Sequence, residues 1–303
     1  MPNLKTIIIT GASGFLGRHL VDQIQDSNFQ VLHLSRDKKK IRLETNKIDV
    51  CSVDSHSSYQ ELYDFFFGIN SEVVFVHLAT HYAGNHSPAD VNKMVVSNIE
   101  FPLKAIEALS RAKPGSLVIN LSTLFQHFES HYYSPTSLYA ATKEAFLRLL
   151  EYYAVFKLLK VVDITIGDTY GLNDTRRKIF PLLIESVSSG KSIALGSGLQ
   201  NLSLIHVTDA ARGIAEVIRD SSIDVADGIR RIQIAPSNNI LVKDLVKRIE
   251  EISGKKLLCT FDPLLDRKRE IYMPVTGLNQ LESFAPLIDL DTGIRQLLEQ
   301  KNI

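Results

Sequence analysis

The chain has 303 residues, of which 45% are hydrophobic and 22% charged. It can therefore bury a sizeable core, and disorder is not expected. Basic and acidic residues number 34 each, so no bulk charge favours a nucleic acid or a membrane surface as a partner.

The cysteines and the lengths of the apolar segments further narrow the class of protein. Cys51 and Cys259 lie far apart and form no CxxC pair, so neither a disulfide framework nor a metal site is predicted. The first residues run directly into an apolar strand, without the hydrophobic region of a signal peptide. No stretch approaches the roughly 20 apolar residues needed to cross a bilayer. We therefore expect a cytoplasmic enzyme.

The first half alternates short apolar runs with amphipathic segments. Near-continuous apolar runs are typical of strands covered on both faces, and they occur at Lys5–Thr10, Gln30–Leu34, Lys47–Val50, Glu72–Leu78, Ser116–Leu121 and Leu159–Thr165. Helical spacing marks Phe15–Gln25, Val91–Ala112 (broken or capped near Pro102) and Tyr139–Phe156. This alternation predicts an α/β fold with a doubly wound, parallel Rossmann sheet.

Past Gly167 the spacing changes. Helices are predicted at Ile179–Ser189, Thr208–Arg219, Leu241–Ser253 and Asp291–Gln300, and extended segments at Ile193–Ala194, Arg231–Ala235 and Leu257–Phe261. We expect residues 1–166 to form a dinucleotide-binding domain to which 201–227 return. Residues 167–200 and 228–303 are expected to form a smaller C-terminal α/β lobe that binds the substrate.

A glycine motif, Gly11-Ala-Ser-Gly14-Phe-Leu-Gly17, joins the first strand to the first helix. A turn this tight needs φ values open to glycine, and a dinucleotide pyrophosphate must approach bare backbone N–H groups at a helix N-terminus. The position between a strand and a helix makes the motif specific. It predicts a cofactor site that includes Gly11, Ser13, Gly14, Phe15, Leu16 and Gly17.

The end of the second strand indicates which dinucleotide binds. An acid at this place binds the ribose 2′-OH of NAD, but the strand ends His33-Leu34-Ser35-Arg36 and the first acid is Asp37. The hydroxyl of Ser35 and the guanidinium of Arg36 suit a 2′-phosphate. NADP(H) is predicted; the alternative is that Asp37 reaches the ribose and Arg36 is solvated.

Tyr139 and Lys143 lie four residues apart and so on one face of a helix. A free phenol has a pKa of about 10, and we expect the neighbouring ammonium to lower the pKa of Tyr139 by stabilising the phenolate. Tyr139 would then act as acid or base on a carbinol or ketone oxygen. Ser122 and Thr123 close the strand before this helix.

These motifs together resemble the short-chain dehydrogenase/reductase superfamily. Asp168-Thr-Tyr-Gly171 is similar to the "N-x-Y-G" turn, and Leu204–Asp209 to the "F-I-H-V-D-D" segment, of its extended branch, the epimerase/dehydratase family, whose members act on nucleotide sugars. The resemblance implies that Thr123 bonds the reacting oxygen and that Lys143 also bonds the nicotinamide ribose. It implies a homodimer formed by Pro102–Ala112 and Tyr139–Phe156. It also implies cofactor contacts at Asp49, Val50, Leu78, Ala79, Thr80, Asn98, Ser122, Tyr139, Lys143 and Asp168.

Within this family, His77–His81, the Asp168–Gly171 turn and Arg269–Ile271 resemble the CDP-abequose and CDP-paratose synthases. The resemblance implies reduction of the C4 ketone of CDP-4-keto-3,6-dideoxyglucose with NADPH, a step in deoxysugar biosynthesis for surface polysaccharide. Dehydration is disfavoured because Leu124 and Phe125 follow Thr123, and neither side chain can transfer a proton.

Three other functions remain open on the same motifs. The first is a nucleotide-sugar epimerase with retained NAD, for which His81 or His127 is a candidate base. The second is a reductase of a non-sugar carbonyl, and the third is a non-catalytic NADP-binding sensor. The complete Thr-Tyr-Lys set argues against the sensor.

The sequence departs from the family where the substrate diphosphate is bound. The usual Arg-Asp pair is replaced by Leu202 and Ser203, and the Arg ahead of the "N-x-Y-G" turn by Thr165. Because a phosphate needs cationic partners, we expect lobe cations, Lys178 among them, to bind it; otherwise the substrate is not a nucleotide sugar. The predicted substrate-binding residues are His81, Thr123, Asp168, Thr169, Arg176, Arg177, Arg267 and Arg269.

Overall fold

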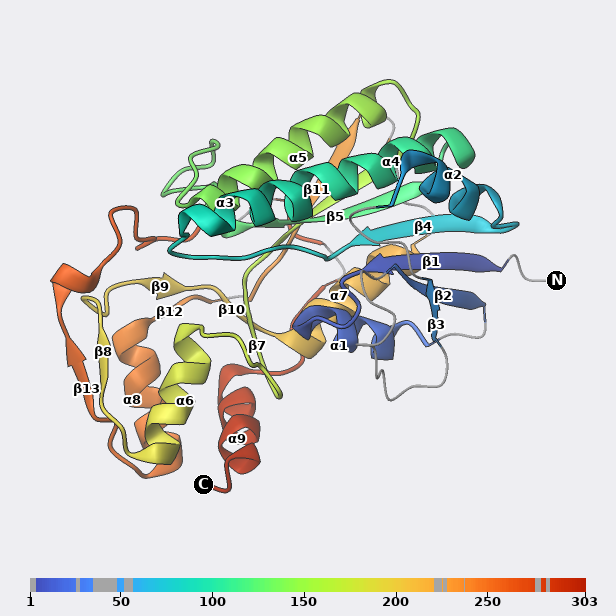
Figure 1. Ribbon diagram of the computed structural model, residues 1–303. Helices are drawn as coiled ribbons and strands as arrows, with labels where there is room; N and C mark the ends of the chain where they lie inside the picture. Colours follow the sequence, from blue (N-terminus) through green and yellow to red (C-terminus); the bar gives the residue numbers. More distant parts are fainter. Residues whose placement is uncertain are drawn as a thin grey trace.

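A parallel sheet of seven strands forms the centre of the computed structural model (Figure 1). The structure describes residues 4–25, 28–34, 48–51, 57–220, 225, 228–236, 238–275, 279–281 and 284–303. The strand order is β11-β6-β5-β4-β1-β2-β3, with every neighbouring pair parallel. The strands are β1 (Lys5–Thr10), β2 (Phe29–Leu34), β3 (Ile48–Cys51), β4 (Glu72–His77), β5 (Leu117–Thr123), β6 (Lys160–Ile166) and β11 (Ile229–Ile234). The predicted Rossmann sheet is confirmed.

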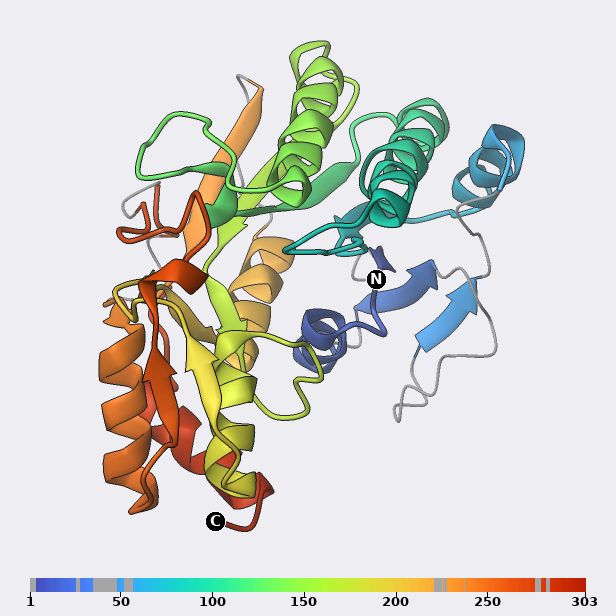
Figure 2. The same ribbon diagram turned by 60° about the vertical axis from the view of Figure 1, so that its left-hand side comes forward.

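Helices cover both faces of this sheet, as its apolar strands require. Helices α1 (Phe15–Gln23) and α7 (Val207–Arg219) pack on one face, where Ile7 and Ile9 enter the core. On the other face Ile8 packs against α2 (Tyr59–Phe67), α4 (Phe101–Ala112) and α5 (Leu138–Val155). Figures 1 and 2 show these two helical layers on opposite sides of the strands.

The helical pattern predicted over Val91–Ala112 is interrupted, as expected near Pro102. Helix α3 (Pro88–Val95) leads into a π-helical turn (Val96–Glu100), and α4 follows it. Pro102 lies in the first turn of α4, and the backbone is already helical at Glu100 and Phe101 before it. Its missing N–H therefore removes one hydrogen bond from a continuous run of helix, directly after the π-helical turn. The π-helical turn places Asn98 in the interior, and such turns often occur at functional sites.

Helix α2 was not anticipated from the sequence. Its nine residues, YQELYDFFF, make little more than two turns, and five of them are aromatic, a residue class that is frequent in strands. A capping box between Ser58 and Glu61 starts the helix, and this S-x-x-E pattern is a sequence signal that could have located it.

The lobe has a core of its own. Helices α6 (Ile179–Ser189), α8 (Val242–Ser253) and α9 (Leu290–Gln300) bury Phe180, Leu245 and Ile294 together. Short strand pairs complete it: β8 (Ile193–Leu195) with β13 (Cys259–Phe261), and β9 (Asn201–Leu202) with β12 (Ile240–Leu241). A third pair, β7 (Asp168–Tyr170) with β10 (Leu204–His206), connects the lobe to the sheet.

The expected domain boundaries need one correction. Residues 228–303 were assigned to the lobe, but β11 (Ile229–Ile234) hydrogen-bonds with β6 as an edge strand of the main sheet. At the buried end of this strand, Ile232 and Ile234 join the core beneath α1 and α7. This packing, and not the position of β11 in the sequence, decides that the strand belongs to the main sheet. In the part of the chain that the structure describes, no helix is both long and apolar enough to span a bilayer.

Candidate active site

In the loop between β1 and α1, stretches of backbone lie so close together that two positions have no space for a side chain. Gly11 has a φ of +75°, and a Cβ added to it would lie 2.7 Å from the Ala79 nitrogen. A Cβ on Gly17 would lie 2.2 Å from the Gly11 carbonyl oxygen. Glycine is therefore required at both positions, and the N-terminus of α1 has no side-chain cap, an arrangement that suits an anion.

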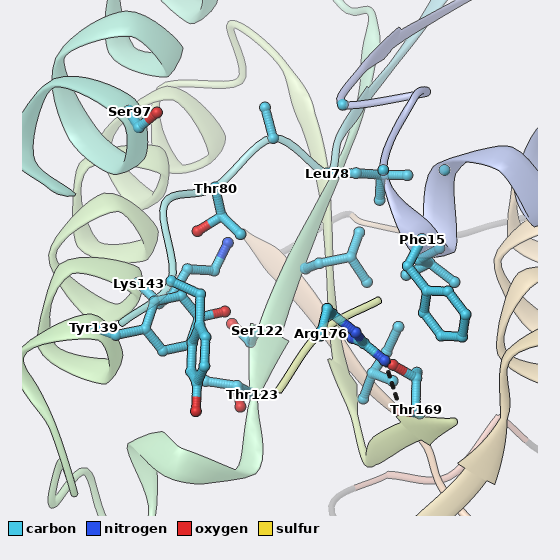
Figure 3. Close-up of a pocket in the computed structure, with 18 of the residues that line it drawn as sticks. Phe15, Leu78, Thr80, Ser97, Ser122, Thr123, Tyr139, Lys143, Thr169 and Arg176 are labelled. Carbon is cyan, nitrogen blue, oxygen red and sulfur yellow. Dashed lines mark hydrogen bonds between the residues drawn. The ribbon is translucent and has the colours of Figure 1, made fainter. Parts of the chain in front are cut away.

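A cavity of about 1160 Å³ opens between this loop, the ends of the strands and the lobe. This exceeds the roughly 300–1,000 Å³ of a pocket for one small ligand, so a dinucleotide and a substrate can share it. Figure 3 shows Lys143, Tyr139 and Thr123 on one side and Phe15, Arg176 and Thr169 on the other. The predicted residues that line the cavity are Gly11, Ser13, Gly14, Phe15, Leu16, Gly17, Leu78, Ala79, Thr80, Ser122, Thr123, Tyr139, Lys143, Asp168, Thr169, Arg176 and Arg177.

Helix α5 carries Tyr139 and Lys143 into this cavity, where Lys143 is buried and Tyr139 is partly exposed. Ser137 caps the helix by accepting a hydrogen bond from the Ala140 N–H. The Tyr139 ring meets the ring of Tyr82 edge-on, with centroids 4.9 Å apart. The predicted pairing of Tyr139 and Lys143 on one helix face is thus present at the cavity.

The expectation that Lys143 lowers the pKa of the Tyr139 phenol is wrong for this structure. Burial raises the pKa of Tyr139 to about 12, and the nearby Thr80 hydroxyl only partly offsets this. Burial lowers the pKa of the Lys143 ammonium to about 8. Desolvation disfavours the charged form of each group, and here it outweighs their proximity. At neutral pH the phenol therefore holds its proton.

Thr123 is fixed by a chain of hydrogen bonds that returns to α5. Its N–H donates to the Gln126 side-chain oxygen at 2.9 Å, and the Gln126 amide donates to buried Glu144 on α5 at 2.6 Å. The Phe125 N–H donates to the Thr123 hydroxyl oxygen at 3.3 Å. The hydroxyl proton of Thr123 remains available to a ligand in the cavity.

The neighbouring hydroxyl, Ser122, is engaged with a residue that the sequence analysis missed. It donates to Asp163 on β6 at 2.8 Å, and the Asn120 amide donates to the same oxygen at 2.6 Å. Asp163 is 2% exposed, and burial raises its pKa. An acid within the apolar run KVVDITI is the signal that could have drawn attention to it.

Asn98 lies behind the cavity wall rather than in it, so its predicted contact with the cofactor is not supported. The residue is 1% exposed. Its oxygen accepts from the His81 N–H at 2.7 Å and the Thr80 hydroxyl at 3.0 Å, and its amide donates to Thr142 at 2.9 Å. Asn98 therefore fixes the 80–81 segment against α5.

Neither histidine considered as a base lines the cavity. The His81 ring lies 3.1 Å from Asp90, and this contact holds it outside. His127 contacts the Tyr132 carbonyl at 3.3 Å on the exposed surface. His81 is therefore outside the lining of the cavity in this structure, and its contact with the substrate stays a prediction.

The lobe contributes positive charge to the opposite wall of the cavity. Arg176 makes two hydrogen bonds of 2.7 Å to Asp174 and donates to the Thr169 hydroxyl and carbonyl at 3.1 and 2.8 Å. Its guanidinium carbon lies 4.2 Å from the centre of the Phe15 ring. Lys178, which also lines the cavity, lies 3.4 Å from Asp168.

Two other predicted arginines lie outside the cavity lining. Arg269 hydrogen-bonds with Ser134 and stacks over Phe128, and exposed Arg267 approaches Gly84. Both belong to a lobe segment tied down by Asp266, which accepts from Ser197 and Gln200. They border the site, and their contact with the substrate stays a prediction.

Part of the predicted cofactor site lies outside the described residues. Ser35 and Arg36 lie outside the described residues, as do the side chains of Asp49 and Val50, whose backbone lies in β3. The adjoining His33 was missed: it lines the cavity, and burial lowers its pKa to about 4. Tyr82 and Gly84 were also missed as lining residues, since loop positions show no periodic signal. In the described residues no cluster suitable for a metal ion occurs.

The comparisons with known proteins agree with this geometry. Residues 7–229 match the NAD dependent epimerase/dehydratase family. The chain belongs to this family. It is 23% identical to the CDP-abequose synthase of Salmonella typhimurium, with 97% of each chain covered, and 25% identical to that of Yersinia pseudotuberculosis, with 83% of this chain and 86% of the relative covered. The fold matches a mutant of UDP-glucuronic acid 4-epimerase from Bacillus cereus in complex with UDP-4-deoxy-4-fluoro-glucuronic acid and NAD, at a TM-score of 0.83, 20% identity and coverage of 98% and 99%.

At the positions where the sequence departs from the family pattern, the side chains are uncharged. Ser203 is buried, and its carbonyl accepts from the Asp168 N–H at 2.6 Å. Leu202 lies in β9, paired with Ile240, and Thr165 is buried in β6. Among the described residues that line the cavity, the cations on the lobe side are Arg176, Arg177 and Lys178.

Proposed function

We propose that the protein is an NADPH-dependent reductase of a keto group, C4, on a nucleotide-linked deoxysugar, similar in reaction to a CDP-4-keto-3,6-dideoxyhexose reductase. The observation that carries the proposal is the meeting of Thr123, Tyr139 and Lys143 with the glycine loop in one cavity. The CDP-abequose synthases among its relatives support the substrate class.

The residues present fit a nicotinamide dinucleotide. A side chain on Gly11 or Gly17 would collide with backbone, and the bare N-terminus of α1 suits the pyrophosphate. Lys143, at the floor of the cavity, would bond the nicotinamide ribose. The choice of NADP over NAD is supported by the sequence Ser35-Arg36. When bound, this group supplies the hydride.

The side chains of the chain handle the oxygen of the substrate. Tyr139 holds its proton at neutral pH because burial raises the pKa of the phenol to about 12, and a protonated phenol is the state that reduction of a ketone requires. Thr123 has a free hydroxyl proton with which to polarise the same oxygen. The Lys143 charge stabilises the phenolate left after proton transfer.

The neighbours of Thr123 support reduction over dehydration. Leu124 and Phe125 line the cavity directly after it, and neither can donate or accept a proton. Elimination of water needs an acid and a base beside the reacting carbons. The ketone is therefore reduced without loss of a hydroxyl group.

The diphosphate of the substrate would bind the cations of the lobe. Arg177 and Lys178 line the cavity together with Arg176, whose charge Asp174 already engages. The lobe would thus hold the nucleotide end while α5 holds the sugar. In this proposal residues 167–200 and 238–303 form the substrate lobe and the remainder the cofactor domain.

The test is a direct assay. Purified protein is incubated with CDP-4-keto-3,6-dideoxyglucose and NADPH or NADH, and cofactor oxidation is followed by absorbance while the product is identified by mass spectrometry. Oxidation of NADPH with formation of a CDP-3,6-dideoxyhexose is expected. Turnover with a simple ketone but with no CDP-, dTDP-, GDP- or UDP-linked keto sugar would overturn the substrate class.

A nucleotide-sugar epimerase is the second candidate, since a solved structure with this fold is a UDP-glucuronic acid 4-epimerase in complex with NAD. An epimerase recycles its hydride and keeps its cofactor. Denaturing the purified protein and identifying the released nucleotide separates the two functions. Stoichiometric NAD would favour the epimerase, whereas a reductase releases its oxidised cofactor after each turnover.

We also propose a homodimer through α4 and α5. Tyr152 and Val155 of α5 and Phe156, which follows the helix, are exposed, and an apolar surface of this kind is typical of a protein interface. Light scattering should give twice the mass of the chain, and Tyr152→Glu should shift the protein toward the monomer. A wild-type monomer would contradict the proposal.

A further inference from the structure

A row of polar side chains crosses the main sheet beneath α5. Strand register places Thr10 beside His77, His77 beside Asn120, and Asn120 beside Asp163. Register partners in a parallel sheet present their side chains on the same face. Two residues earlier on the same strands, that face is entirely apolar, with Ile8, Phe75, Val118 and Val161. We call Thr10, His77, Asn120 and Asp163 the polar row.

Each end of the polar row is held by hydrogen bonds. The Thr10 hydroxyl lies 2.8 Å from His77 Nδ1. At the other end, Asn120 and the adjoining Ser122 both donate to Asp163 Oδ1, at 2.6 and 2.8 Å. Asp163 is thereby held in one position, and a carboxylate buried this completely needs a compensating interaction.

Lys143 belongs to the helix that packs over the polar row. Helix α5 packs on this face of the sheet, and Phe146, one turn beyond Lys143, meets the His77 ring edge-on at 5.3 Å between centroids. The charge of Lys143 lowers the pKa of His77 and opposes the rise in the pKa of Asp163. Lys143 and Asp163 both belong to the described part of the chain, and no direct ion pair joins them there. The charge of one therefore acts on the other through space.

We infer that Asp163 is a positioning residue, the buried counter-ion that keeps Lys143 protonated at the floor of the cavity. It acts through Lys143 and does not itself reach the cavity, since Ser122 separates it from the lining. The inference deepens the proposed function, because it concerns the charge that Lys143 brings to the reaction.

The other groups around this pair do not substitute for Asp163. His77, from β4, is kept neutral because full burial and the charge of Lys143 both lower its pKa. Arg231, on β11, faces Asp163 but forms an ion pair with Glu151 at 2.7 Å. Around Tyr139 stand Thr80, Tyr82 and the distant charge of Arg176. Among the described groups that act on Lys143, Asp163 is the one that raises its pKa.

The first experiment removes the charge and keeps the shape. Asp163→Asn retains an oxygen that can accept from Asn120 and Ser122. Loss of an opposite charge lowers the pKa of a buried lysine, so the alkaline limb of kcat/KM should move to lower pH by about one unit. Asp64→Asn, on the exposed surface of α2, is the matched control and should leave the limb in place. An unmoved limb in folded Asp163→Asn protein would overturn the inference.

A second experiment does not depend on turnover and so separates this inference from the proposed function. Urea midpoints are measured for Asp163→Asn, Lys143→Met and the double variant. Because each single change leaves the partner charge buried alone, the double variant should lose less than the sum of the two single losses. Should Asp163→Asn alone not fold, Lys143→Met should restore folding to it. Additive losses, or no restoration, would refute the pairing even if the protein proves to be a reductase.

Discussion

The two walls of the cavity position charge in different ways. On the sheet side, Lys143 is buried and Asp163 acts on it without direct contact. On the lobe side, Arg176 is joined to Asp174 by two hydrogen bonds of 2.7 Å. A lysine kept from direct pairing retains an ammonium that can bond a ligand, whereas a paired guanidinium must share its donors between its acid and any incoming phosphate.

The backbone shows the same difference. The sheet wall allows one arrangement, since added side chains at Gly11 and Gly17 would collide with backbone atoms. The lobe wall consists of long side chains from a connecting loop, residues 171–178. We therefore expect changes on the sheet wall to affect the rate and cofactor binding, and changes on the lobe wall to affect KM alone.

The largest expected effect is on the sheet wall. Tyr139→Phe removes the proton donor and should lower kcat by about 10³-fold, within the range for loss of a general acid. The affinity for NADPH, measured by fluorescence titration, should stay within a few-fold of the wild type. Retained turnover would show that another group delivers the proton.

The glycine loop should give the next largest effect. Gly17→Ala places a Cβ 2.2 Å from the Gly11 oxygen, so α1 must move away from the loop. NADPH should bind at least about tenfold more weakly, and overpacking should lower the stability by about 1–3 kcal/mol. Gly68→Ala is a suitable control, because its nearest contact is an ordinary 3.4 Å. Unchanged NADPH affinity in Gly17→Ala would contradict the anion site.

The pH profile tests the buried ammonium. Since burial lowers the pKa of Lys143 to about 8, the lysine is protonated below that pH and neutral above it. The value of kcat/KM, which reports groups of the free enzyme, should fall by about tenfold for each pH unit above 8. Constant kcat/KM between pH 7 and pH 10 would show that the charge of Lys143 is not required.

The smallest effect is expected on the lobe wall. Arg177→Ala or Lys178→Ala should raise KM for the nucleotide sugar by about tenfold, the value of one hydrogen bond to a charged group. The kcat and the NADPH affinity should not change. Arg267→Ala provides the control, since Arg267 does not line the cavity. An equal rise in KM in that control would place the diphosphate elsewhere.

The sheet wall was also the more predictable of the two from the sequence. Gly11, Gly17, Tyr139 and Lys143 obey local rules of turn geometry and helical spacing, so their spatial relation follows from a few adjacent residues. The same holds for the buried strands, whose apolar runs are continuous.

What the sequence did not reveal depends on contacts between distant residues. Asp163 gains its role from Asn120 and Ser122 on the next strand, and a single strand shows no such register. The raised pKa of Tyr139 follows from burial by the 80–82 segment, which spacing on α5 cannot indicate. Strand β11 was assigned to the lobe because nothing local distinguishes an edge strand of one sheet from that of another.

The path of the chain has a consequence for engineering. It leaves the sheet after β6, returns through β10, α7 and β11, and leaves again for α8. At the first crossing Gly167 lies so close to Ser203 that an added Cβ would be 2.5 Å from its carbonyl oxygen. The lobe is therefore not one continuous segment of the chain. A chimera that exchanges substrate specificity needs several splice points, and no single truncation yields either the lobe or the sheet domain intact.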